Sequence, residues 1–265
     1  IMGLGSTVKA IWVLLQGQTD PNVTSIWTLL QNMSITPCCI GKMGGVAYYV
    51  DDLDGLDAND GLSWANAVQT IGRAIALNNE TVDWAETPKK YNAIYVKPAV
   101  YTEEDLSFPY YCWLIGLGIR GVDTQAEIHP AAGSCFAGTM LGCSLVNLWL
   151  EVDEALPILD IGSAGGSLID HCQFYFNADI AVTGIDTETA THLEVRFCDF
   201  GDGSDKFFYR CIANHGGAGM FAHNCRYHDN NMYAYECGIW IEGTCRGTQT
   251  VIKQNVIQVN TAPDA

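Results

Sequence analysis

The chain has 265 residues, 48% of them apolar, which is enough for a packed core in one large domain or two small ones. Its 30 acidic and 13 basic residues give a net charge of −17, which disfavours nucleic acid and anionic membranes as partners. No run approaches the roughly 18 apolar residues of a membrane span, and the amino terminus lacks the pattern of a secretion signal. With 27 glycines and 16% charged residues, the composition favours a turn-rich β protein.

Residues 1–40 differ in kind from the rest and repeat one motif, IWVLLQ at 11–16 and IWTLLQ at 26–31. Each copy has apolar residues at helical spacing, and Asp20 with Pro21 suits a helix start between them. We therefore expect a helical hairpin whose apolar stripes pack on the rest of the chain, on a sister subunit or on a larger assembly. The predicted attachment or oligomerisation residues are Val8, Ile11, Trp12, Leu15, Val23, Ile26, Trp27 and Leu30.

The next segment, residues 41–92, contains five aspartates in ten positions, from Asp51 to Asp60. A calcium loop of the helix-loop-helix kind does not fit, because Leu56 and Ala58 stand where ligands are needed. A calcium site of another geometry stays open. Turn formation accounts for more of the residues, since glycines at 55 and 61 supply turn chemistry after a strand that ends at Val50.

A helix is expected after this acidic turn, capped by Ser63 and beginning at about Trp64. Its apolar stripe is Trp64, Ala67, Val68, Ile71, Ala74 and Ile75. Such a stripe needs a surface to cover, and the open end of a stack of strands is one. We therefore predict a capping helix between the first strand and the remainder of the chain.

Residues 93–265 carry a long-period repeat. Five segments align, at 144–152, 168–176, 193–201, 220–228 and 251–259. Repeats of this length made of short alternating strands indicate a solenoid, and residues 93–260 provide roughly six coils. The alignment has a reference position occupied by Leu148, Cys172, Cys198, Cys225 and Asn255, and a second column occupied by Ile158, Ile185, Ile212 and Ile239.

The eleven cysteines have no paired spacing typical of a zinc site, so a metal bound through sulfur is not expected. Apart from the open calcium alternative, the sequence predicts no metal and no cofactor. Cys172, Cys198 and Cys225 are expected to stack as buried thiols on successive coils. Stacked strands place equivalent Cβ atoms about 4.8 Å apart, whereas a disulfide prefers about 3.8 Å. Reduced thiols, as in a protein assembled in cytosol, are therefore predicted.

The acidic turn and capping helix, followed by AIYVKPAVYTE at 93–103 and LIGLGIRGV at 114–122, resemble the beginning of a known architecture. It is the right-handed parallel β-helix of the pectate-lyase-like superfamily, in particular the versions found in bacteriophage virion proteins. The resemblance covers about residues 46–260 and implies an all-β, single-stranded β-helix preceded by the helical hairpin and capping helix. The architecture hosts lyases, hydrolases, tailspikes and structural fibres, so it is less specific for function.

Outward positions beside the reference column form one polar patch, which is the predicted place for binding or cleaving a glycan. Ion pairing between coils, Asp170 with Arg196 and Asp199 with Arg226, is the alternative explanation. NHGG at 214–217 resembles the His-Gly step of polygalacturonases, but its partner motifs and those of pectate lyases are missing, so no catalytic residue carries over. The candidate residues of the patch are Asp170, Arg196, Asp199, His223 and Arg226.

The resemblance implies first a structural protein of a virus particle, most readily of a tailed phage. It would be a fibre, spike or capsid decoration, trimeric by analogy with phage spikes, attached through residues 1–40 to capsid or tail proteins and assembled in the host cytoplasm. The alternative is a β-helix that binds or cleaves a host surface polysaccharide. A host adhesin is the third hypothesis, which the missing secretion signal disfavours.

Overall fold

The computed structural model describes residues 44–87, 89–119, 125–177, 182–201, 207–215, 225–241 and 250–259. The expected helical hairpin, with all eight predicted attachment residues, lies outside these ranges. Residues 44–265 form one compact unit. Neither helix found in the described ranges has the length and apolar character that a membrane crossing requires.

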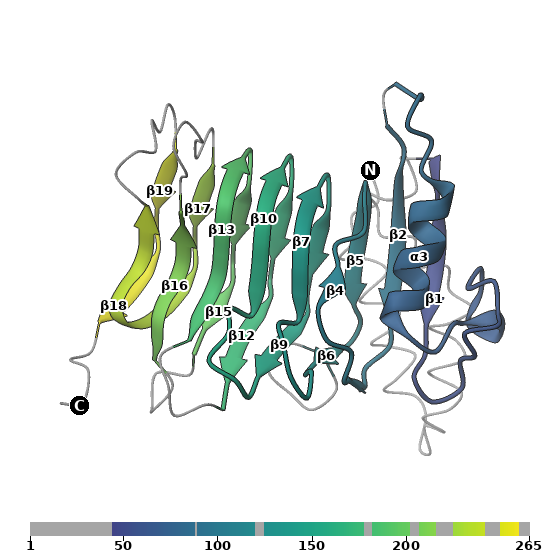
Figure 1. Ribbon diagram of the computed structural model, residues 1–265, viewed down its shortest axis with the longest axis horizontal. Coiled ribbons are helices and arrows are strands. Elements are labelled where there is room, and N and C mark those ends of the chain that lie inside the picture. Colours follow the sequence, from purple (N-terminus) through teal and green to yellow (C-terminus); the bar gives the residue numbers. More distant parts are fainter. Residues whose placement is uncertain are drawn as a thin grey trace, which may run out of the picture. The chain divides into compact units, whose positions relative to one another are not determined.

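The unit is a parallel β-solenoid of about five turns, close to the six coils expected (Figure 1). Its eight-stranded sheet is here called wall A. The strands of wall A, in spatial order, are β1 (Gly44–Val50), β2 (Tyr91–Val96), β5 (Cys112–Gly116), β8 (Ser144–Val146), β11 (Leu168–Asp170), β14 (Glu194–Arg196), β17 (Arg226–His228) and β19 (Val251–Lys253).

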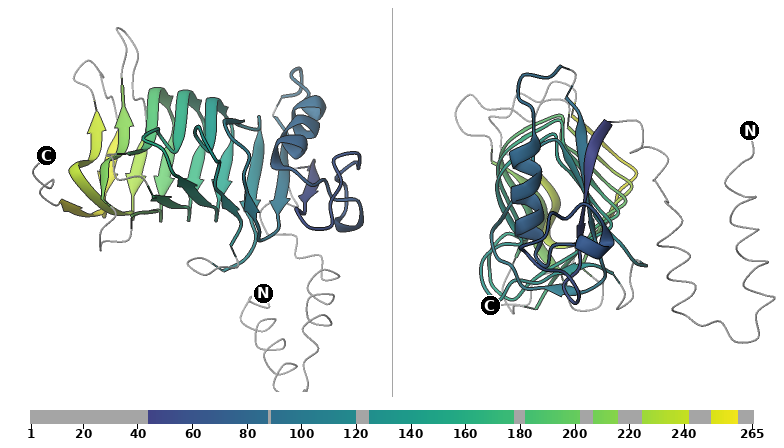
Figure 2. Two further views of the ribbon diagram at one scale, coloured as in Figure 1. Left: turned by 60° about the horizontal axis from the view of Figure 1, so that its bottom comes forward. Right: turned by 90° about the vertical axis from the view of Figure 1, so that its right-hand side faces the viewer.

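A second sheet has two arms, here called wall B and wall C, which β18 (Asn231–Ile241) joins. All strand pairs in both sheets are parallel, and the coils superimpose around a common interior in the end-on view of Figure 2. The other strands of wall B are β3 (Val100–Tyr101), β6 (Glu127–Ile128), β9 (Trp149–Val152), β12 (Gln173–Phe176), β15 (Asp199–Phe200) and β20 (Val256–Val259). Those of wall C are β4 (Leu106–Ser107), β7 (Phe136–Leu141), β10 (Leu159–Gly165), β13 (Thr183–Thr191) and β16 (Phe208–Asn214).

Inward side chains of successive coils stack on one another and fill the interior. In wall A one such column is Leu114, Leu145, Ile169, Val195 and Tyr227, all with no measurable exposure. In wall B, the rings of Phe174 and Phe200 lie face to face with centroids 4.4 Å apart. The solenoid therefore has a dry, filled core, and its functional groups must lie on its outer faces.

The reference column is confirmed for Leu148, Cys172 and Cys198 but is wrong for Cys225. Asn230, 32 positions after Cys198, occupies the next place, with Asn255 beyond it. The amide of Asn230 is buried at a corner of the coil, where it accepts the N–H of Cys198 at 2.9 Å and donates to the Asn255 side chain at 2.9 Å. An asparagine thus takes a position that an apolar pattern assigned to cysteine.

Cys225 lies at the opposite end of its wall A strand from the predicted place. It directly precedes β17 and is level with Leu193, which directly precedes β14. Cys172, Cys198 and Cys225 are nonetheless buried, and the eight cysteines within the described ranges form no disulfide. In the second predicted column, Ile185, Ile212 and Ile239 are in register, but Leu159 rather than Ile158 precedes them.

Each two-residue corner between wall A and wall B begins with a residue in the left-handed backbone region. These residues directly precede the reference position, and their φ angles lie between 52° and 57°. They are Asn147, His171, Phe197, Asp229 and Gln254. One strained backbone conformation therefore recurs in five successive coils.

The predicted helix from about Trp64 is wrong in its start. Ser63 caps only a 3₁₀ turn, η2 (Trp64–Asn66), by accepting the Asn66 N–H at 3.2 Å. The α-helix, α3, begins later (Ile71–Thr81), because Val68 pairs with Val50 as a parallel bridge and holds the chain extended. Helix α3 lies at the first end of the solenoid, with Ile71, Ala74 and Ile75 buried in the core (Figure 2).

Aspartates of the acidic run accept hydrogen bonds from backbone N–H groups of the segment that leads into α3. Asp51 accepts two N–H groups of its own turn at 3.2 and 3.3 Å and pairs with Lys97. Asp57 accepts the N–H of Gln69 at 3.0 Å and that of Thr70 at 2.9 Å, while Asp60 accepts an N–H of its own turn at 3.0 Å. These bonds confirm Asp51 and Asp60 as turn-formers, whereas Asp57 connects the turn to the start of α3.

Candidate functional site

The predicted patch is only partly assembled, on the outer face of wall A. Arg196 Nη2 lies 3.0 Å from Asp170 Oδ2 on the adjacent strand, as the ion-pair interpretation expected. Arg196 Nη1 also lies 3.2 Å from Glu194 Oε1, and His228 Nε2 lies 2.9 Å from the same oxygen. His171 Nδ1 lies 2.6 Å from Asp170 Oδ1. The charges alternate and are paired, which is typical of a network that holds neighbouring coils together.

Asp199 and Arg226 are not neighbours, so the predicted pair between them is wrong. Asp199 lies on wall B, where the Asn231 side chain donates to it at 2.8 Å. Arg226 lies on wall A, opposite Glu194. The coil that begins after Cys198 is longer than the alignment assumed, and this shift moves Arg226 to another wall. His223 lies outside the described residues.

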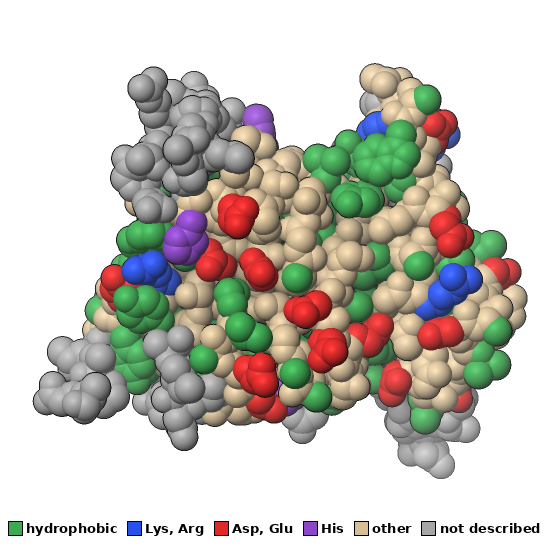
Figure 3. Space-filling model, viewed as in Figure 1, with side chains coloured by type: hydrophobic (Ala, Val, Ile, Leu, Met, Phe, Trp, Pro, Cys, Tyr) green, Lys and Arg blue, Asp and Glu red, His purple; other side chains and the backbone are tan. Residues whose placement is uncertain are grey.

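A different cluster of titratable groups lies on the outer face of wall C. Asp160 on β10 and Asp186 on β13 are register partners on adjacent strands, about 4.8 Å apart along the stack. His215, which directly follows β16, places Nε2 2.9 Å from Asp186 Oδ1. Figure 3 shows acidic side chains spread over the face that these strands form, with His and Lys or Arg gathered toward its β16 and β18 end.

Burial raises the pKa of the Asp186 carboxyl above that of an ordinary aspartate. Asp160 adds to this increase, while His215 and Arg210 oppose it. A carboxyl group that tends to keep its proton, next to a second carboxylate, is the arrangement by which sites separate a proton donor from a base. The pair is therefore chemically suited to general acid–base work.

Trp240 closes one end of this cluster. It lies on β18, in the same outward column as Asp160 and Asp186. The rings of His215 and Trp240 are 4.8 Å apart, and the Arg210 guanidinium lies 4.0 Å over the indole. The site therefore combines an aromatic side chain with charged hydrogen-bonding groups, as ligand sites for polar rings do.

The sequence singled out His215, in NHGG, but missed Asp160 and Asp186. A signal was available in the second column. Asp186 directly follows Ile185 of that column, and Asp160 follows Leu159, which takes the place predicted for Ile158. Extending the predicted column by one position therefore finds Asp186 and Trp240, whereas Asp160 is found only with Leu159 in the column.

No family model matches the chain, and no curated protein matches it. The parallel β-solenoid stands on the structure alone, and the candidate site stands on its geometry.

Proposed function

We propose that the protein is a structural component of a virus particle, a β-helical fibre, spike or capsid decoration anchored through residues 1–40. The observation that carries the proposal is the first part of the fold, in which β1, the acidic turn and α3 lead into a parallel solenoid. This series is the one that resembles bacteriophage virion proteins of the pectate-lyase-like type. A filled core and ion-paired coils also suit a rod that displays its outer faces.

The attachment segment gives this proposal its test. The full chain is expected to form a stable oligomer, a trimer by analogy with phage spikes, in analytical ultracentrifugation. Replacing Trp12 and Trp27 by Ser should dissociate it, because the paired motifs would lose their largest apolar side chains. The matched control replaces Gln16 and Gln31, the polar residues that end the same two motifs.

A monodisperse full-length monomer, or an oligomer that persists in the double tryptophan variant, would contradict the proposal. Electron microscopy of the native particle provides the direct test. The expected result is stoichiometric density for the solenoid on a capsid or tail.

A second function is supported by the pair of Asp160 and Asp186 beside His215. We propose it as the alternative: a host surface polysaccharide is bound along wall C and cleaved at this pair. Asp186, with its raised pKa, would give its proton to the glycosidic oxygen as the bond breaks. Asp160 would either deprotonate the water that attacks the anomeric carbon or bond to that carbon itself, in which case water then hydrolyses the glycosyl ester.

Release of reducing ends from a panel of glycans tests this alternative. Asp186→Asn is expected to lower turnover by about 100-fold or more, because asparagine cannot give up a proton. Asp199→Asn, an acidic residue on wall B, is the control and should retain activity. Equal losses in both variants, or no turnover on any glycan, would speak against cleavage at wall C.

A further inference from the structure

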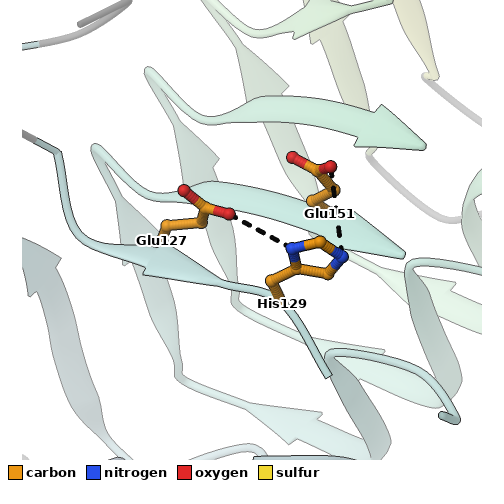
Figure 4. A group of neighbouring side chains, drawn as sticks. All are labelled: Glu127, His129 and Glu151. Atoms are coloured by element: carbon orange, nitrogen blue, oxygen red, sulfur yellow. Dashed lines mark ion pairs between the residues drawn. The ribbon is translucent and has the colours of Figure 1, made fainter. Parts of the chain in front are cut away.

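We propose that wall B carries a site for a divalent transition-metal ion, with His129, Glu151 and Asp153 as ligands. Glu127 on β6 lies opposite Trp149 on β9, which brings His129, just after β6, level with Glu151. Asp153 follows β9 directly. Alternate residues of a strand point to the same side, so all these side chains share the outer face of wall B. Figure 4 shows the imidazole of His129 between the carboxylates of Glu127 and Glu151.

Both imidazole nitrogens face carboxylates. Nδ1 of His129 lies 3.3 Å from Glu127 Oε1, while Nε2 lies 3.1 Å from Asp153 Oδ1 and 4.0 Å from Glu151 Oε1. The donor atoms of Glu127, His129 and Glu151 all lie within 4.8 Å of one another. Nε2 is enclosed by protein, and its contacts with Asp153 and Glu151 do not have hydrogen-bond geometry. An enclosed nitrogen directed at two carboxylates without hydrogen-bond geometry suits a metal ion that joins all three groups.

The distances suit bonds of transition-metal length. Two atoms that each lie about 2.1 Å from a zinc ion cannot be more than about 4.2 Å apart. The separations of 3.1 and 4.0 Å from Nε2 meet this condition with little movement. One imidazole with carboxylates favours Zn²⁺ or a similar ion over Ca²⁺ and Mg²⁺, which prefer oxygen ligands alone.

The surrounding contacts fix the orientation of the proposed ligands. Glu127 can accept the Nδ1 proton of His129, which leaves Nε2 free for the metal, as carboxylates behind metal-binding histidines commonly do. Trp149 Nε1 donates to Glu151 Oε2 at 2.8 Å, so Oε1 remains directed at His129. Asn177 Nδ2 donates to Glu151 Oε1 and, at 3.1 Å, to Asp153 Oδ1, which are the oxygens that face His129 Nε2. Turning the amide over would replace this donor with Oδ1 as a further ligand.

A protonated imidazole, paired with carboxylates on both sides, would explain the same contacts without a metal. The two explanations differ in stoichiometry and in spectrum. Full-length protein freed of metal with a chelator should bind one equivalent of Zn²⁺ at this site in isothermal titration at neutral pH. Co²⁺ should bind there with the visible absorption of a nitrogen and oxygen ligand set, and Ca²⁺ at equal concentration should not displace it.

The variants His129→Gln and Glu151→Gln are expected to weaken Zn²⁺ binding more than 10-fold and to remove the Co²⁺ absorption. Glu127→Gln should weaken binding by about 10- to 100-fold while the Co²⁺ absorption remains, because Glu127 only positions the imidazole. His215→Gln is the matched control, because His215 also lies beside a carboxylate but on wall C. Circular dichroism verifies that each variant keeps its β structure.

Three results would overturn the proposal. They are the absence of Zn²⁺ binding to the wild-type chain, equal Zn²⁺ binding by His129→Gln and wild type, and equal affinity for Ca²⁺ and Zn²⁺. The first would leave the protonated imidazole as the explanation of the geometry. The second would mark any bound ion as adventitious, and none of the three bears on the proposed virion or glycan functions.

Discussion

Asn230 is a buried polar side chain at a corner where earlier coils place Leu148, Cys172 and Cys198. Its amide accepts the Cys198 N–H at 2.9 Å and donates to the Val195 carbonyl at 3.1 Å. It therefore completes backbone hydrogen bonds that the apolar corners leave to other groups. A buried amide is tolerated when it is satisfied in this way, and its removal leaves the backbone groups without partners.

Asn230→Ala is expected to lower the free energy of unfolding by about 2–4 kcal/mol, because a buried N–H and a buried carbonyl lose their partners. Urea denaturation followed by circular dichroism measures the change. The adjacent Asn231→Ala is the control, since Asn231 is exposed and its side chain donates to the Asp199 carboxylate on the outer face. A difference between the two variants below about 0.5 kcal/mol would contradict a structural role for the Asn230 amide.

Asp186 makes stability depend on pH in a direction set by its raised pKa. The folded chain holds this proton more tightly than the unfolded chain. The resulting stability is fully present below the unfolded pKa, about 3.9, and is lost as pH rises through the folded pKa. Asp186→Asn should therefore gain stability relative to wild type as pH rises above about 4, with no difference at lower pH.

Glu236 is expected to change the stability with pH in the opposite direction to Asp186. The hydrogen bond with Arg210 lowers the pKa of Glu236, so its stability is present above the unfolded pKa and is lost as pH falls. Glu236→Gln should lose stability relative to wild type at neutral pH. Thermal melts of both variants and of wild type across the pH range measure the two effects. A difference between Asp186→Asn and wild type that does not change with pH would contradict a raised pKa at Asp186.

Among the elements, α3 has a start that is stabilised by side chains from other parts of the chain. Glu103 accepts the N–H groups of Ile71 and Gly72, each at 2.7 Å, from beyond the helix. Asp57, at the other side, accepts the Thr70 N–H and hydroxyl, each at 2.9 Å. Carboxylates at a helix start complement its unpaired N–H groups and its dipole. The start of α3 therefore depends on residues that are distant in sequence.

Asp57→Ala should destabilise the solenoid by about 1–3 kcal/mol, because it removes three hydrogen bonds from the cap of α3. Asp54→Ala, in the same loop, is the control: the Asp54 carboxylate makes none of these bonds, and a change within about 0.5 kcal/mol is expected. Denaturant titration compares the two. Equal effects would mean that the acidic loop acts through its charge and not through the cap.

The periodicity of apolar residues predicted the solenoid and most of its strands, because stacking in parallel coils demands the same residue class at every inward position. It failed at Cys225 and at Trp64 for physical reasons. Coil length is set by loops and by the bonds of Asn230, and the helix start is set by Glu103, neither of which leaves a periodic signal. The clusters around Asp186 and His129 join residues from different coils, so their prediction required the true coil lengths.

At the scale of the whole molecule, each coil contacts its neighbours along one axis, so local gains and losses add along the stack. The two-residue corners between wall A and wall B are the simplest example. Asn147, His171, Phe197, Asp229 and Gln254 all hold φ angles of 52° to 57° there, and only one of them is an asparagine, which tolerates that conformation well.

The repeated corner consequently offers several equivalent positions at which the solenoid can be stabilised by the same substitution. Phe197→Asn should raise the free energy of unfolding by about 0.5–1 kcal/mol, because asparagine relieves left-handed strain that costs other residues about 1–2 kcal/mol. Tyr209→Asn, an equally exposed aromatic with ordinary φ, should give no gain in the same thermal melts. Since these corners share one geometry, a substitution that stabilises one corner can be made at the others. The number of substituted corners then sets how far the free energy of unfolding is raised.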